Sequence, residues 1–165
     1  MYSLHRQRRS VRMAQSIHHV ELDMPSKRIW NFVSDMNNWA PLVPGYTEHE
    51  IINERQSTWK LHGDIGVVQK DVRVKVRITE WTEPSHIIFE LSGSSESWVG
   101  DGYFKATPLS QAKTQITGSL NITVKGMMGA MINPVLKTVL PKIGKEFTEK
   151  VAAKIAETEK MTATV

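Results

Sequence analysis

The sequence predicts an α+β domain in which a curved antiparallel sheet of about seven strands wraps around one long C-terminal helix, with two short helices after the first strand. Two observations predict this architecture. Apolar and polar residues alternate with period two from about residue 45 to residue 126. A single apolar stripe at helical spacing follows this region, and it must be buried against the sheet. A helix laid across a strongly curved sheet need not fill it, so we expect a cavity between the two.

The first elements are short. Residues 16–23 alternate as a strand, which places His18 and His19 on opposite faces. A helix is expected to follow Pro25, with Ser26 as its N-cap. The two asparagines at positions 37 and 38 end that helix, and a second short helix or turn covers residues 39–43.

Strands are then expected near residues 46–54, 57–65, 71–81, 87–91, 103–107 and 115–124. In the clearest of them valines alternate with Arg73, Lys75 and Arg77, so that one face is buried and the other is solvated. Lipid headgroups or phosphates are the alternative partners of these basic residues. Gly100 and Gly102 predict a bulge or a bend in the sheet.

The C-terminal helix carries one apolar stripe made of Leu136, Leu140, Ile143, Phe147, Val151 and Ile155. Because proline lacks a backbone N–H group, we expect this helix to start near Asn133 and to kink near Pro141. Three methionines gather just before it, and they form either ordinary core or a flexible lid at the cavity mouth.

The charge is concentrated in the N-terminal segment. The net charge is +4, yet without Arg6, Arg8, Arg9 and Arg12 the chain holds 17 basic and 17 acidic residues. A basic pI therefore does not indicate nucleic-acid binding, although these arginines offer a peripheral contact with an anionic membrane. We expect three regions: a basic leader over 1–14, a single ligand-binding domain over 15–158 and a frayed tail over 159–165.

The composition excludes several classes of site. The chain has no cysteine, which excludes disulfides and thiolate metal sites and agrees with a cytoplasmic location. No metal site, cofactor or nucleophile motif is expected. Tyr103, His62, Asp64 and Glu90 are the groups that acid–base catalysis would use if they faced the cavity. Alternation places His62, Asp64 and Glu90 on the solvated face instead.

The order and spacing of several short motifs resemble the START-like (SRPBCC, helix-grip, Bet v 1-like) superfamily, over roughly residues 16–157. The matching pieces are IWNFVSD at 29–35, LVPGY at 42–46, GDIG at 63–66, ITEWTEP at 78–84, GDG at 100–102, TQIT at 114–117 and IGKEF at 143–147. Within the superfamily the chain is most similar to the small accessory subunit of carbon monoxide dehydrogenase and its relatives, and to polyketide cyclases.

The resemblance implies a module that binds a hydrophobic or amphipathic small molecule such as a lipid, a quinone or a polyketide. It also implies an accessory role to a redox enzyme, because relatives of that accessory subunit serve the maturation or membrane recruitment of a molybdenum-containing dehydrogenase. Two alternatives stay open: a cyclase- or dehydratase-like enzyme that acts in the same cavity, and a partner-binding assembly factor. The chain lacks the Pro-rich linker and apolar C-terminal anchor of longer members, which argues against direct membrane anchoring.

Ten residues are expected to bind the ligand, chosen because they are large, apolar and set on predicted inward faces or at the cavity mouth. They are Trp59, Phe89, Leu91, Tyr103, Leu120, Ile122, Met127, Met128, Met131 and Leu140. Tyr103 is expected to be the polar group inside, because a buried hydroxyl needs a partner that a ligand can supply.

Overall fold

The structure is a computed structural model that describes residues 14–64, 69–93 and 97–163. Its elements are β1 (Ala14–Leu22), α2 (Ser26–Val33), α3 (Met36–Trp39), the 3-10 turn η1 (Ala40–Leu42), β2 (Tyr46–Ile51), β3 (Gln56–Asp64), β4 (Gln69–Thr82), β5 (His86–Gly93), β6 (Trp98–Ser110), β7 (Lys113–Val124) and α4 (Gly126–Ala163). This is the α+β helix-grip layout that the sequence predicts. The four N-terminal arginines lie outside the described residues.

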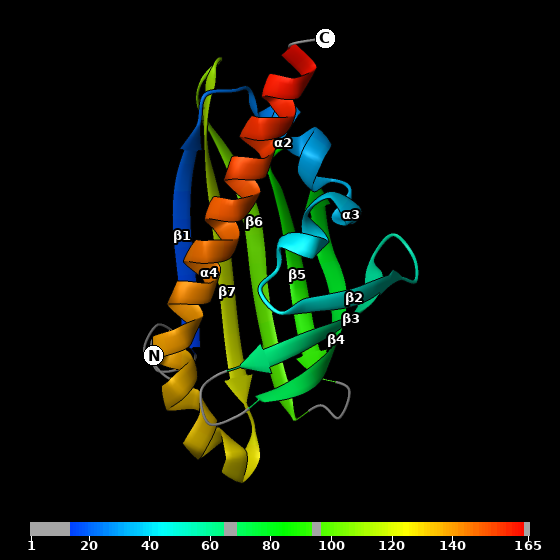
Figure 1. Cartoon of the computed structure of the whole chain (residues 1–165), viewed down its shortest axis with the longest axis vertical. Coiled ribbons are helices and arrows are strands. Elements are labelled where there is room, and N and C mark those ends of the chain that lie inside the picture. Colours follow the sequence, from blue (N-terminus) through cyan, green and yellow to red (C-terminus); the bar gives the residue numbers. More distant parts are fainter. Residues whose placement is uncertain (1–13, 65–68, 94–96, 164–165) are drawn as a thin grey trace, which may run out of the picture.

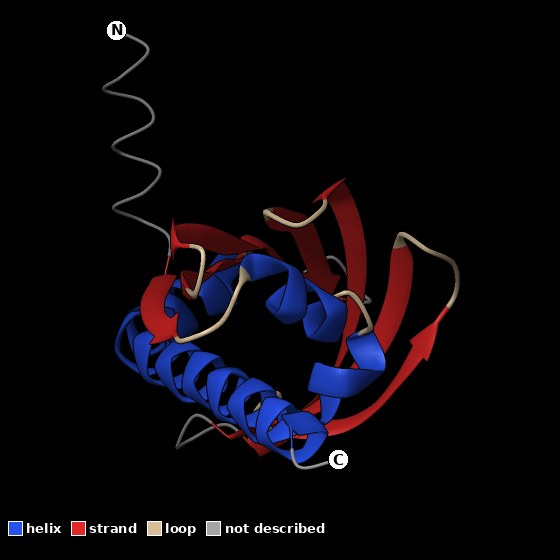
Figure 2. Cartoon of the chain, turned by 90° about the horizontal axis from the view of Figure 1, so that it is seen from above, coloured by secondary structure: helices blue, strands red, loops and turns tan. Residues whose placement is uncertain are grey.

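The seven strands form one antiparallel sheet with the order β1-β7-β6-β5-β4-β3-β2. Successive hairpins build β2 to β7, and the first strand closes the order by pairing with the last (Figure 1). Register shifts in three strands, β2, β4 and β6, each mark a bulge or irregularity. Bulges bend strands and increase their twist, so they favour the curvature with which the sheet surrounds the helices in Figure 2.

Helix α4 differs from the expected helix at both ends. It starts at Gly126, not near Asn133, and it continues without interruption past Pro134 and Pro141 to Ala163. The prediction failed because both prolines and the residues four positions before them are exposed, so water can satisfy the carbonyl groups left without a partner. The methionine segment is therefore helical, and α4 extends five residues into the expected tail.

Small residues allow α4 to lie close to β1 and β7, its main neighbours in the sheet. A Cβ atom on Gly144 would overlap the side chain of Ser16 on β1, and one on Gly118 of β7 would approach the Thr148 hydroxyl to 2.7 Å. Ser16 and Thr148 are themselves buried. The helix thus covers one edge of the concave sheet face instead of its centre.

The largest core cluster joins α2, the C-terminal half of α4 and the adjoining strands. It consists of Leu22, Met24, Ile29, Trp30, Val33, Ile87, Ile116, Val151, Ala152 and Ile155. Helix α2 is held in it by Trp30, which packs edge-on against Trp81 at 5.2 Å. Ser26 is not the N-cap of α2, because that position is Pro25, and the Ser26 hydroxyl lies 3.2 Å from that of Thr114.

The substitution Gly144→Ala tests the close approach of α4. We expect it to lower the free energy of unfolding by about 1–3 kcal/mol, because overpacking at Ser16 outweighs the gain in helix propensity. Urea unfolding of the double variant Ser16→Gly/Gly144→Ala should recover the loss. The exposed position Lys142→Ala is the control, and a Gly144→Ala protein as stable as the parent would contradict this packing.

Candidate functional site

The strand register shows which side chains face the helices. Leu120 pairs with Gly102, which pairs with Phe89, and Ile122 pairs with Gly100, which pairs with Leu91. Directly paired residues share a face, and every second residue along a strand returns to it. Since Gly118 meets α4, all of these residues lie on the concave face of the sheet.

Burial along this face decreases from one end to the other. On β7, Ile116 is 1% exposed, whereas Leu120 and Ile122, which face the same way, are only half-buried. On β5 the same change occurs between the buried Ile87 and the half-buried Leu91. Apolar side chains that point inward and still contact solvent indicate an open apolar hollow. We call the surface made by Trp59, Phe89, Leu91, Leu120 and Ile122 the concave site.

Gly100 and Gly102 form the floor of the concave site. The β5–β6 and β6–β7 ladders are regular at both glycines, so the expected bulge is absent there. A Cβ on Gly102 would collide with the Phe89 ring, and one on Gly100 would meet Ile122 and Leu91. The glycines therefore let larger side chains lie flat over the sheet, which is a packing role that their sequence pattern did not reveal.

The concave site brings together five of the ten expected ligand-binding residues, and the other five lie elsewhere. Tyr103 pairs with Ser119 and Ile88, so it points to the convex face and is not the inner polar group. Leu140 is buried in the core at 2% exposure. The remaining three, Met127, Met128 and Met131, are exposed on the first turns of α4 and form neither core nor a loop.

Polar groups reach the interior at a different place, which we call the polar–aromatic cluster: Asn37, Trp39, Tyr46, His49 and Trp59. Trp39 stacks on Trp59 at 5.7 Å, and the His49 ring lies 5.2 Å from the Trp59 ring. Asn37 Oδ1 accepts a hydrogen bond from His49 Nε2 at 2.8 Å. In the neutral imidazole, Nδ1 then accepts from the Tyr46 hydroxyl at 2.6 Å. The cluster adjoins the concave site through Trp59.

A bulge explains why the sequence did not reveal this cluster. Tyr46 pairs with Leu61 and Glu48 pairs with Lys60, so Thr47 is an extra residue in β2. Under strict alternation Tyr46 and His49, three positions apart, would face opposite sides. The extra residue puts both on the concave side, and no local pattern in residues 46–51 signals it.

The four candidate catalytic groups lie on the convex face. His62 bonds to Asp71 at 3.0 Å, and this hydrogen bond from the imidazole lowers the pKa of the Asp71 carboxyl. Glu90 forms an ion pair with Arg77. Asp64 shares the face of His62, and Tyr103 is convex as described above. Catalysis by these four residues within the concave site is therefore excluded.

Two features are absent from the described residues. No group of three or more histidine and carboxylate side chains in residues 14–64, 69–93 and 97–163 is arranged to hold a metal ion. Nor does any helix in the part of the chain that the structure describes combine the length and apolarity needed to cross a bilayer.

Comparison with known proteins assigns the family. A family model matches residues 13–158. A START superfamily protein from Mycobacterium smegmatis superposes with a TM-score of 0.60 and 18% identity, covering 87% of this chain and 98% of that one. The chain belongs to the START-like superfamily. No curated protein matches this START-like chain by sequence.

Two further solved structures share the START-like fold. A conserved protein from Geobacillus kaustophilus has a TM-score of 0.75 and 20% identity, with 87% of this chain and 96% of that chain covered. The Zhui aromatase/cyclase from Streptomyces sp. R1128 has a TM-score of 0.64 and 16% identity, with 91% and 96% covered. At these identities the likeness establishes the fold.

The substitution Tyr46→Phe tests the polar–aromatic cluster. It removes the hydroxyl that bonds to His49 while keeping the ring, so we expect the free energy of unfolding to fall by about 1 kcal/mol. The matched control is Tyr103→Phe, which removes the same atom from the convex face and should change stability less. Equal effects of the two substitutions in urea unfolding would show that the Tyr46–His49 bond has no special weight.

Proposed function

We propose that this START-like protein binds a hydrophobic or amphipathic small molecule in the concave site. The observation that carries the proposal is the half-buried state of Phe89, Leu91, Leu120 and Ile122, which face inward and yet contact solvent. Removing such apolar surface from water is worth about 25 cal/mol per Å². An apolar ligand that covers these side chains gains this free energy without any change in the fold.

The polar–aromatic cluster suits the polar end of an amphipathic ligand. The Tyr46 hydroxyl donates to His49 and keeps lone pairs that a ligand hydroxyl can reach. The Trp39 and Trp59 rings supply flat apolar surface beside it. A molecule with one hydroxyl or carbonyl group and a rigid apolar body, such as a quinone or a polyketide, matches this combination better than a plain hydrocarbon.

An accessory role to a redox enzyme is the finer part of the proposal. It is supported by the motif resemblance to the accessory subunit of carbon monoxide dehydrogenase, and a neighbouring gene for a molybdenum-containing dehydrogenase would strengthen it. Cyclase- or dehydratase-like catalysis is the second candidate. The Tyr46–His49 pair favours it, because this pair sets titratable groups on the concave side at hydrogen-bond distance. Neighbouring polyketide genes would favour this candidate.

The substitution Leu120→Trp tests the location of the ligand. We expect it to fill the concave site and to weaken binding of the apolar dye 1-anilinonaphthalene-8-sulfonate by about tenfold or more, which equals about 1.4 kcal/mol of lost contact. Fluorescence titration measures the affinity. Ile17→Trp is the control, because Ile17 is 49% exposed on the convex face.

A second variant, Leu91→Trp, approaches the same hollow from β5 and should act in the same direction. Urea unfolding of each variant establishes that the protein is folded under the conditions of the titration. Unchanged dye binding by both folded variants would contradict a ligand site on this face.

A further inference from the structure

The first turns of α4 expose more apolar surface than a soluble surface ordinarily does. Met127 is 94% exposed, Met131 63% and Met128 55%. Met127 and Met131 are one helical turn apart and therefore share a face. We propose that this methionine turn, with its flanking lysines, docks the protein on an anionic lipid bilayer.

The methionines are held outward by a fixed framework. The Asn133 side chain both accepts from the Val124 N–H at 2.9 Å and donates to the Val124 carbonyl at 3.0 Å. Gly129 is buried against the same carbonyl, where a Cβ atom would collide. Gly129 and Asn133 lie about 200° around the helix from Met127 and Met131, at 100° per residue. One face of these turns is thus fastened to β7, and the opposite face presents the methionines.

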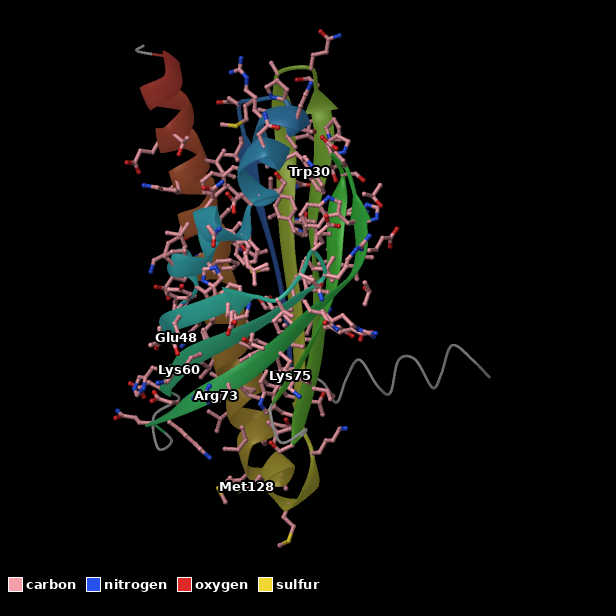
Figure 3. All side chains as sticks on the ribbon, turned by 90° about the vertical axis from the view of Figure 1, so that its right-hand side faces the viewer. Trp30, Glu48, Lys60, Arg73, Lys75 and Met128 are labelled. Carbon is pink, nitrogen blue, oxygen red and sulfur yellow. The ribbon has the colours of Figure 1, made fainter. Side chains whose placement is uncertain are left out.

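The charge around this face complements anionic lipid. From residue 121 to residue 145 the chain holds no aspartate or glutamate, whereas Lys125, Lys137, Lys142 and Lys145 are all exposed. Arg73 and Lys75 on β4 lie toward the same end of the molecule as Met128 in Figure 3. Exposed apolar residues bounded by lysines, without acids, are the composition of helices that bind at the surface of anionic membranes.

This docking surface is separate from the concave site, so the inference stands apart from the proposed function. It also differs from a contact through the four N-terminal arginines, because it depends on apolar insertion as well as on charge. A lipid surface accounts for both the methionines and the lysines: the former enter the acyl region and the latter stay among the headgroups.

Vesicle co-sedimentation of the full chain tests the inference. The vesicles are phosphatidylcholine alone, or phosphatidylcholine and phosphatidylglycerol in equal amounts. We expect the parent protein to bind the anionic vesicles preferentially and Met127→Asp/Met131→Asp to bind them about tenfold more weakly or worse. Each of Lys125→Gln and Lys137→Gln should weaken binding about fivefold. Leu109→Asp, at a 49% exposed apolar residue beside the β6–β7 turn, is the matched control and should bind like the parent.

Three results would overturn the proposal. The first is full vesicle binding by the double methionine variant. The second is loss of binding on changing Arg6, Arg8, Arg9 and Arg12 to glutamine while the methionine variant still binds. The third is absence of vesicle binding by the parent together with methionine-dependent capture of a protein, which would assign the surface to a protein partner. Because the substituted methionines are exposed, the variants should retain the parent's urea midpoint.

Discussion

The close contact of α4 with β1 and β7 determines what the rest of the fold can do. Gly144 and Gly118 bring the helix so near to one edge of the sheet that a single added methyl group would collide. The helix therefore lies over that edge, and the concave face of β5 and β6 stays partly open. A larger residue at either glycine would move the helix away from this edge. The hollow is thus a consequence of packing between small residues.

Curvature is the second requirement, and it has a chemical consequence. The extra residue at Thr47 in β2 turns both Tyr46 and His49 inward. This places one hydrogen-bonded polar pair beside the two tryptophans and next to an otherwise apolar surface. Apolar floor and polar end together favour an amphipathic ligand, and they do so without any metal site among the described residues.

Periodicity was sufficient to predict the architecture and part of the site. Strict alternation on β5 and β7 placed Phe89, Leu91, Leu120 and Ile122 correctly, because no bulge interrupts their ladders. The face of Tyr103 was not deducible, since its strand begins with glycines that give no apolar alternation. His49 was missed because a bulge changes the face of every residue beyond it. The start of α4 was misplaced because propensity rules do not show that exposed carbonyls tolerate proline.

The central claim is that the concave site holds a small apolar or amphipathic molecule. Native mass spectrometry of the full chain, purified from its host without detergent, tests it most directly. The account predicts a species heavier than the chain by the mass of one small organic molecule, which solvent extraction releases and which adding the extract restores. A spectrum of the bare chain alone, together with no uptake of lipids, quinones or apolar dyes, would contradict the account.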